Sequence, residues 1–371
     1  MDVIDLLKNA SHQVRVFSMM HPENLQTEDS KFFPSLVAYN SGEGSLWEKL
    51  KGIGRLFYSF EAKRKMQALL DEWQPDVAHL HNIYHQLSPS ILAPLKAKKI
   101  PIIMTVHDYN LISPDKDTYY PEMGKAYYKF LFVQKYSFGK RLLLVLKKYF
   151  EDVTGFYKTV NLYILPSEYV KAIFVEAGFA VEKLRVLPHF ITTTTPTALP
   201  ETIAQKLPAS YAISFGSLSE DKGATFLIEL CERLAYPLVL VGSLTNGYTL
   251  PVSANTTYLG VQDKSTLTEL IKRAECVLGA SELPETFGLV PLETIALGKP
   301  FIGLKAGAYA EIINNTNGYL ATDKEELERY LKHHLTSLVY FDAEDIKQDA
   351  EKRFSKKHYL LSFEQLLGEV T

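Results

Sequence analysis

Short apolar runs alternate with longer amphipathic stretches along most of the chain. A run of four to eight apolar residues is typical of a strand that is buried on both faces of a parallel sheet, and the stretches between the runs have the spacing of helices that cover such a sheet. The predicted strands are residues 12–19, 75–82, 100–106, 162–166, 184–189, 211–216, 237–242, 257–261, 274–279 and 301–304.

The stretches between these runs predict helices and one linker. The predicted helices are residues 1–10, most of 44–73, 88–97, 123–150, 167–177, a segment from 224, a segment from Pro291 that Gly298 and Pro300 close, and 355–367. Strand and helix alternation predicts an α/β fold with parallel sheets. Residues 192–208, rich in Thr, Pro and Ala, predict a linker. We therefore expect a first domain of residues 1–195 plus 355–371, and a second of residues 208–354.

Composition narrows the class of protein. The chain has 371 residues, 46% hydrophobic and 22% charged, and a formal net charge of −3. This balance is typical of a globular protein and disfavours nucleic acid as a partner. Cys231 and Cys276 both lie in apolar segments, which predicts buried free thiols and a cytoplasmic protein. The sequence contains neither an apolar run long enough to span a bilayer nor the pattern of a secretion signal.

The segment 281–300, SELPETFGLVPLETIALGKP, carries the chemistry that best fits a ligand site. A loop with Glu285 and Gly288 follows a predicted strand and meets a predicted helix, and Glu293 lies on the first turns of that helix. The carboxyl end of a parallel strand is where such sheets bind ligands, and the amides of a helix N-terminus suit phosphate oxygens. Two carboxylates beside a phosphate site predict binding of a sugar nucleotide. The alternative for Glu293 is a carboxylate that only stabilises the helix start.

Glu285 and Glu293, with Phe287 and Gly288 between them, resemble the E-x7-E signature of family 4 retaining glycosyltransferases, and the chain is similar to the group 1 glycosyltransferases. The segment GSLSEDKG upstream and LGKPFIGLKAGAYAEII downstream strengthen the resemblance. The resemblance implies the GT-B architecture, in which two Rossmann-like domains face each other across a cleft. Family members begin with a strand and a glycine-rich loop, whereas this chain opens on a predicted helix, so we expect the first domain to lack its first strand.

The resemblance also implies roles for individual residues. His107, in the turn His107–Asp108, and Glu285 would contact the transferred sugar, Lys222 the diphosphate and Glu293 the ribose. Ser217 stands where the family has an arginine, so one cation of the diphosphate clamp is missing. The resemblance implies neither a metal nor another cofactor, and a metal site at His79 and His81 is disfavoured because no third ligand stands out. The expected donor-binding residues are Gly216, Ser217, Lys222, Gly242, Val261, Phe287, Gly288, Leu289 and Glu293.

Residues 123–150 hold seven basic residues, no acidic ones, and many interleaved Tyr, Phe and Leu residues. This pattern is typical of a helix that lies on an anionic membrane surface. It is equally typical of an amphipathic helix whose apolar face packs on its own domain. The family often uses lipid-linked acceptors, which favours peripheral contact with the inner face of the membrane.

The sequence thus predicts a retaining glycosyltransferase that moves a sugar from a nucleotide diphosphate sugar to a polysaccharide or lipid-linked acceptor, in cell-wall or surface glycan assembly. The alternative is a non-catalytic relative that binds a sugar nucleotide or a partner. Ser217 and the absent first strand motivate this alternative. A nucleotide-sugar epimerase is a weaker third option, since the acid and base carboxylates that it needs are not apparent.

Overall fold

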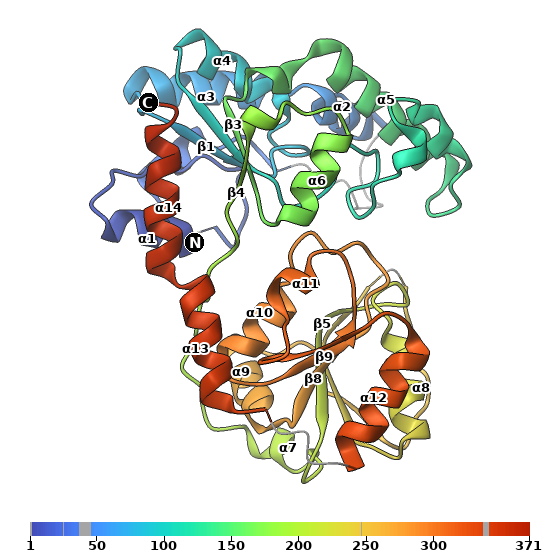
Figure 1. The fold of residues 1–371 in the computed structure, drawn as a ribbon. Helices are drawn as coiled ribbons and strands as arrows, with labels where there is room; N and C mark the ends of the chain where they lie inside the picture. Colours follow the sequence, from blue (N-terminus) through green and yellow to red (C-terminus); the bar gives the residue numbers. More distant parts are fainter. Residues whose placement is uncertain (1, 25, 37–45, 246, 337–340) are drawn as a thin grey trace. The chain divides into compact units, whose positions relative to one another are not determined.

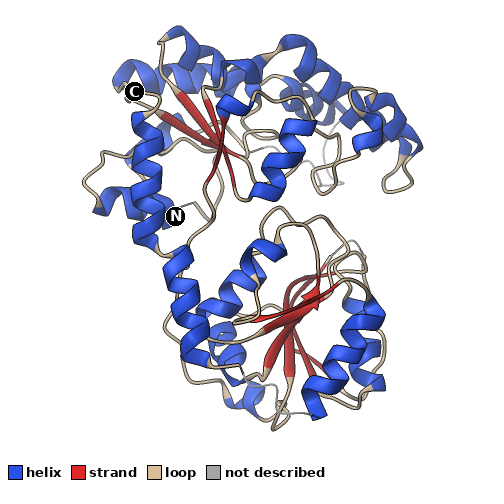
Figure 2. Ribbon diagram, viewed as in Figure 1, coloured by secondary structure: helices blue, strands red, loops and turns tan. Residues whose placement is uncertain are grey.

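The computed structural model describes residues 2–24, 26–36, 46–245, 247–336 and 341–371. The chain forms two compact units. Unit 1 comprises Met1–Pro166, Val170–Leu187 and Leu360–Thr371, and unit 2 comprises Ser167–Tyr169 and Pro188–Tyr359. Each unit contains one parallel sheet with helices packed against it (Figures 1 and 2). The predicted α/β class is therefore confirmed.

Unit 1 is built on four parallel strands in the order β1-β2-β3-β4. Each strand lies inside an apolar run that predicted it, and β2 and β3 are buried along their whole length. Residues 2–9 precede the sheet as a helix, as the sequence predicted. The strands are β1 (Ala78–His81), β2 (Ile102–Thr105), β3 (Leu162–Leu165) and β4 (Leu184–Val186).

The helices of unit 1 largely match the predicted stretches. The main difference lies at residues 123–150, where two short 3-10 turns precede one helix. The helices are α1 (Asp2–Asn9), α2 (Leu46–Phe57), α3 (Phe60–Glu72), α4 (Leu92–Ala97), α5 (Phe138–Thr154), α6 (Glu168–Glu176) and α14 (Lys356–Gly368), and the first residues of α6 and α14 belong to unit 2. The 3-10 turns are η1 (Glu28–Phe32), η2 (Pro89–Ile91), η3 (Pro121–Met123), η4 (Tyr127–Phe132), η5 (Phe156–Thr159) and η6 (Val181–Lys183).

The strand predicted at residues 12–19 is wrong. This segment has no regular secondary structure, and it pairs with none of the four described strands of the unit. Two of its residues bond instead to Asp29 in η1: the amide of Val16 donates to Oδ2 at 2.8 Å, and Nε of Arg15 donates to Oδ1 at 2.6 Å. Alternation of polar and apolar residues therefore did not produce a strand here, because none of the described strands lies beside this segment to form a ladder with it.

Unit 2 is built on six parallel strands in the order β10-β9-β8-β5-β6-β7. β5 and β8 are neighbours at the centre, so the loops that follow them emerge side by side at the same edge of the sheet. The strands are β5 (Ala212–Leu218), β6 (Leu238–Leu244), β7 (Thr256–Tyr258), β8 (Cys276–Gly279), β9 (Phe301–Leu304) and β10 (Gly318–Ala321).

Helices cover both faces of the unit 2 sheet (Figure 1). α9, α10 and α13 pack on one face, and α8 and α12 pack on the other. Side-chain oxygens start several of these helices, as when Asp263 accepts from the amides of Ser265 and Thr266 before α9. The helices are α7 (Glu201–Ala204), α8 (Ala224–Arg233), α9 (Lys264–Arg273), α10 (Leu289–Ala296), α11 (Tyr309–Ile312), α12 (Lys324–Thr336) and α13 (Ala343–Phe354).

The two faces of this sheet form separate apolar cores because successive side chains of a strand point to opposite sides. In β5, Ile213 and Phe215 join the core under α9, α10 and α13, whereas Ala212 joins the core under α8 and α12. Cys231 and Cys276 lie in the second core as free, buried thiols, and burial raises the pKa of each to about 12. The predicted free thiols are therefore confirmed, and burial disfavours the thiolate form of each.

Candidate active site

The segment that carries the two signature glutamates is a loop after β8 followed by α10, as the sequence predicted. Gly288 is the N-cap residue, and α10 starts at Leu289, two residues before the predicted start. By helix geometry the first amides of α10 have no carbonyl partner within the helix, and Leu289 is 56% exposed. These amides point out of the carboxyl edge of the sheet, where an anionic ligand would be stabilised.

The loop between β5 and α8 is pressed against the loop after β8. A Cβ on Gly223 would lie 2.1 Å from the carbonyl oxygen of Ala280, so only glycine allows this approach. Next to it, the amide of Glu282 donates to the carbonyl of Asp221 at 3.0 Å. The backbone contact thus brings Lys222, from one loop, to Glu285, from the other.

Lys222 and Glu285 form an ion pair with 2.6 Å between Nζ and Oε1. The same carboxylate oxygen accepts a hydrogen bond from Oγ of Ser281 at 2.7 Å. Both residues that the sequence singled out are therefore in contact, although 63 positions separate them in the chain. The sequence analysis missed Ser281, which only its place four residues before Glu285 would have suggested.

The ends of β5 and β6 carry three further predicted residues. Gly216 lies opposite Gly242 in the register, and Ser217 lies opposite Ser243. The hydroxyl of Tyr258 donates to the carbonyl of Gly242 at 2.9 Å. These strand ends are adjacent to the Lys222 loop, so backbone and the small Ser217 side chain form that part of the edge.

Two other predicted donor-binding residues differ sharply in exposure. Val261 is 72% exposed just after β7, whereas Phe287 is only 4% exposed. The ring of Phe287 packs edge-on against His189 and Phe354, with centroid distances of 5.0 and 6.1 Å. Phe287 therefore anchors the signature loop to the core.

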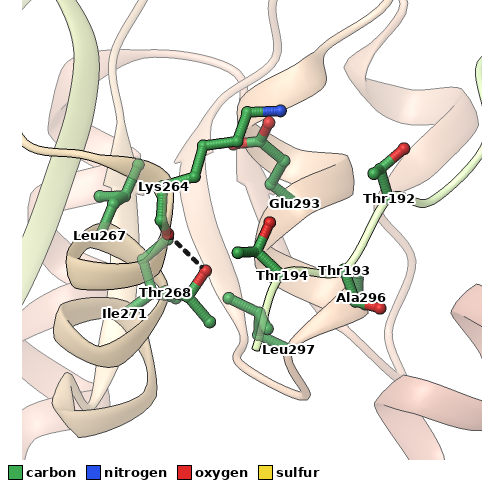
Figure 3. Close-up of a pocket in the computed structure, with 10 residues that line it drawn as sticks. All are labelled: Thr192, Thr193, Thr194, Lys264, Leu267, Thr268, Ile271, Glu293, Ala296 and Leu297. Carbon is green, nitrogen blue, oxygen red and sulfur yellow. Dashed lines mark hydrogen bonds between the residues drawn. The ribbon is translucent and has the colours of Figure 1, made fainter. Parts of the chain in front are cut away.

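Glu293 lines a small hollow of mixed polar and apolar character between α9, α10 and the segment before α7 (Figure 3). Three consecutive threonines, Thr192–Thr194, face it, and the Lys264 side chain extends toward the Glu293 carboxylate. Burial raises the pKa of Glu293, and the charge of Lys264 opposes this shift. Lys222 and Glu285 do not line this hollow, so the two signature carboxylates occupy different environments. The sequence analysis missed Lys264 and the threonines.

His107 lies in unit 1, directly after β2. Its Nε2 is 2.9 Å from Nδ1 of His81, which ends β1, so the two rings are hydrogen-bonded. His79 contacts the Thr105 hydroxyl through Nε2 at 2.7 Å. Burial lowers the pKa of His107 and lowers that of His79 well below its usual range, so burial favours the neutral form of both rings. In the described part of the chain, no cluster of three or more His, Cys, Asp or Glu residues could hold a metal ion.

The basic segment 123–150 uses much of its charge inside unit 1. In α5, Lys147 and Lys148 are buried with Glu151, and Nζ of Lys147 lies 2.6 Å from the Glu151 carboxylate. Before α5, Lys135 pairs with buried Asp115 at 2.9 Å. The opposite face of α5 leaves large apolar side chains in water: Phe138, Leu142 and Leu146 are 60%, 38% and 51% exposed. None of the helices that the structure describes is long and apolar enough to cross a bilayer.

Solved structures with the same architecture include three sugar-processing proteins. Sucrose-phosphate synthase from Thermosynechococcus elongatus is 17% identical, with a TM-score of 0.67 over 98% of this chain and 90% of that chain. HepE from Anabaena, in complex with UDP and glucose, is 18% identical, with a TM-score of 0.62 over 91% and 86%. The lipopolysaccharide outer core galactosyltransferase WaaB is 15% identical, with a TM-score of 0.54 over 83% and 79%.

These likenesses show that the chain has the GT-B fold of two Rossmann-like domains. A comparison with curated proteins found no match. Two family models divide the sequence between them. Glycosyl transferases group 1 matches residues 200–353, and Glycosyltransferase Family 4 matches residues 1–195. The chain therefore belongs to glycosyltransferase family 4, and it is a transferase of the GT-B type.

Proposed function

We propose that this protein is a retaining glycosyltransferase that moves a sugar from a nucleotide diphosphate sugar to a glycan or lipid-linked acceptor during cell-wall or surface glycan assembly. The observation that carries the proposal is the grouping of Lys222, Glu285 and the N-terminus of α10 at one edge of the unit 2 sheet. HepE, which has the same fold, was solved with UDP-glucose and with UDP and glucose. We therefore favour a sugar nucleotide as the donor.

The donor would extend along the carboxyl edge of unit 2. The first amides of α10 and the Lys222 ammonium would hold the diphosphate, and Glu285 would accept hydrogen bonds from sugar hydroxyls. Glu293 would accept from the ribose hydroxyls, and the backbone at Gly216, Gly242 and Val261 would line the nucleotide. Further contacts with the donor would come from Ser217, the backbone of Phe287, Gly288 and Leu289.

In the proposed reaction the bond between the anomeric carbon and the diphosphate oxygen breaks, and a bond from the acceptor oxygen to the same face of that carbon forms. The acceptor proton passes to the departing phosphate, so no protein nucleophile is required. Charge that develops on the diphosphate would be stabilised by Lys222 and the α10 amides. His107, in unit 1, is proposed to contact the sugar through a neutral imidazole.

Surface features of unit 1 support a cytoplasmic protein that binds the inner face of the membrane. α5 turns Lys147, Lys148 and Glu151 inward and exposes Phe138 and Leu142, which reverses the usual arrangement of a surface helix in water. An apolar face is stabilised when it enters the boundary between lipid headgroups and acyl chains, and Lys140 on the same helix suits anionic headgroups. A lipid-linked acceptor would be reached at that surface.

Turnover of a panel of nucleotide sugars tests the proposal. Purified wild-type protein and Glu285→Ala are incubated with UDP-, GDP- and ADP-sugars, and release of the nucleoside diphosphate is measured. We expect one donor to be turned over and Glu285→Ala to lose about 100-fold or more in rate. Glu282→Ala is the matched control, because Glu282 lies in the same loop but is exposed and pairs with Lys324. Equal rates in wild type and Glu285→Ala would refute the proposal.

A further inference from the structure

The two groups that the proposed function assigns to different parts of the donor are bonded to each other. Lys222 Nζ and Glu285 Oε1 are 2.6 Å apart, and the side chains are only 32% and 19% exposed. Ser281 donates to the same oxygen at 2.7 Å, so the carboxylate is held by a cation and a hydroxyl together. In the absence of a ligand, the single lysine proposed for the diphosphate is therefore neutralised by a residue of the site itself.

The backbone on both sides of this pair is fixed. The close approach of Gly223 to Ala280 joins the Lys222 loop to the Glu285 loop, and the amide of Ala308 donates to the Glu285 carbonyl at 2.9 Å. The two side chains can therefore separate by rotating about their own bonds, without movement of the loops. Such a rotation is fast compared with loop or domain motion, so the pair can exchange partners during ligand binding.

A diphosphate and a carboxylate compete for the Lys222 ammonium. The phosphate oxygens carry more negative charge than the carboxylate, but they must approach a lysine that already has a partner at contact distance. If Glu285 stayed in place, its negative charge would lie beside the diphosphate and would repel it. The carboxylate must then move away or find new hydrogen-bond donors, and the hydroxyls of an attached sugar are such donors.

We propose that the Lys222–Glu285 pair is a built-in competitor that couples diphosphate binding to sugar binding. The inference rests on the proposed function. The diphosphate takes the ammonium, and the released Glu285 carboxylate binds the sugar hydroxyls. A nucleoside diphosphate without a sugar leaves Glu285 charged and without these new partners. The pair therefore favours a nucleotide sugar over the free nucleotide, which also promotes release of the nucleotide after transfer.

Affinity measurements on both ligand types test this coupling. Calorimetric titrations use UDP, GDP and ADP and their glucose conjugates with wild type, Glu285→Gln and Lys222→Met. Glu285→Gln should bind the nucleoside diphosphate about two- to fivefold more tightly than wild type, because the competitor has lost its charge. The same variant should bind the nucleotide sugar more weakly, so the two affinities change in opposite directions. Lys222→Met should weaken the binding of both ligands.

Glu282→Gln is the matched control, because it removes one negative charge from the same loop but leaves the pair intact. It should change the nucleotide affinity by less than about twofold. If wild type binds nucleotides but Glu285→Gln binds the nucleoside diphosphate equally well or more weakly, the coupling is overturned. The proposed function is not contradicted by that result. A folded wild type that binds none of the six ligands would overturn both. A variant that merely misfolds cannot bind one ligand more tightly, so the expected result separates the coupling from a structural role.

Discussion

The carbonyl oxygen of Gly216 occupies the space in which a side chain on Gly242 would lie. A Cβ on Gly242 would be 1.8 Å from that oxygen, and the φ of Gly242 is +140°. A side chain at position 242 would therefore prevent β5 and β6 from pairing as far as Ser217 and Ser243. The contact places the Lys222 loop, which follows β5, at the edge of the sheet.

Gly242→Ala should destabilise unit 2 strongly, because the methyl group forces the two strands apart and also strains the backbone. We expect the free energy of unfolding to fall by about 3 kcal/mol or more. Gly260→Ala is the matched control: its φ is +70°, but a Cβ there would have no atom within 4 Å. It should cost about 1 kcal/mol from backbone strain alone. Thermal unfolding of the purified variants measures both, and equal losses of stability would contradict the steric argument.

Ser217→Arg should strengthen the binding of a nucleoside diphosphate. Ser217 is exposed at the edge where Lys222 is the proposed diphosphate cation, so a guanidinium there adds two hydrogen bonds to phosphate. The expected gain is about tenfold in affinity. Ser243→Arg adds the same charge at the position opposite in the register, and it should give a smaller gain. Calorimetric titration with the nucleotide that wild type binds measures both variants. An unchanged affinity in Ser217→Arg would show that the diphosphate does not lie beside β5.

Glu293→Gln should stabilise the protein at neutral pH. Burial raises the pKa of Glu293 above the value of 4.5 that it has when unfolded, so this carboxylate binds a proton more readily in the native state than in the unfolded state. Stability from this group is present below pH 4.5 and is lost as pH rises through the raised pKa. The neutral amide of glutamine avoids this loss. The melting temperature of Glu293→Gln should therefore exceed that of wild type at pH 7, and the difference should shrink toward pH 4. Melting curves at both pH values check the sign, and a destabilised variant at pH 7 would contradict it.

Replacing the exposed apolar residues of α5 should weaken membrane binding without unfolding unit 1. The variant Phe138→Ser, Leu142→Ser, Leu146→Ser removes the apolar face, and we expect co-sedimentation with phosphatidylserine-containing vesicles to fall about tenfold or more. The matched control replaces Val175, Val181 and Leu361 with serine, because these are 40%, 53% and 52% exposed on other elements of the unit. If both triple variants sediment with vesicles as wild type does, the contact with membranes through residues 123–150 is refuted.

Local sequence pattern was sufficient for most of the parallel strands and for the signature loop, but it did not predict β10 (Gly318–Ala321). Apolar runs such as residues 274–279 and 301–304 predicted β8 and β9 because a strand buried on both faces needs apolar side chains at every position. The failure at residues 12–19 has a clear cause. An alternating pattern describes the strand itself and says nothing about whether another strand lies beside it to accept its hydrogen bonds.

The contacts that define the candidate site were less predictable. The Lys222–Glu285 pair joins residues 63 positions apart, and it exists because Gly223 lets one loop touch another. The sequence pattern also could not predict the burial of Lys147 and Lys148, because lysines on an amphipathic stretch are usually exposed. Tertiary pairing with Glu151 overrides that tendency, and it reverses which face of α5 meets water.

The anomeric configuration of the transferred sugar tests the central claim most directly. Wild type is incubated with the α-linked nucleotide sugar that it turns over, and the coupling constant of the anomeric proton in the first product is followed by nuclear magnetic resonance. Same-face attack beside a diphosphate held by Lys222 and the α10 amides predicts an α-linked product. A β-linked product would contradict the account.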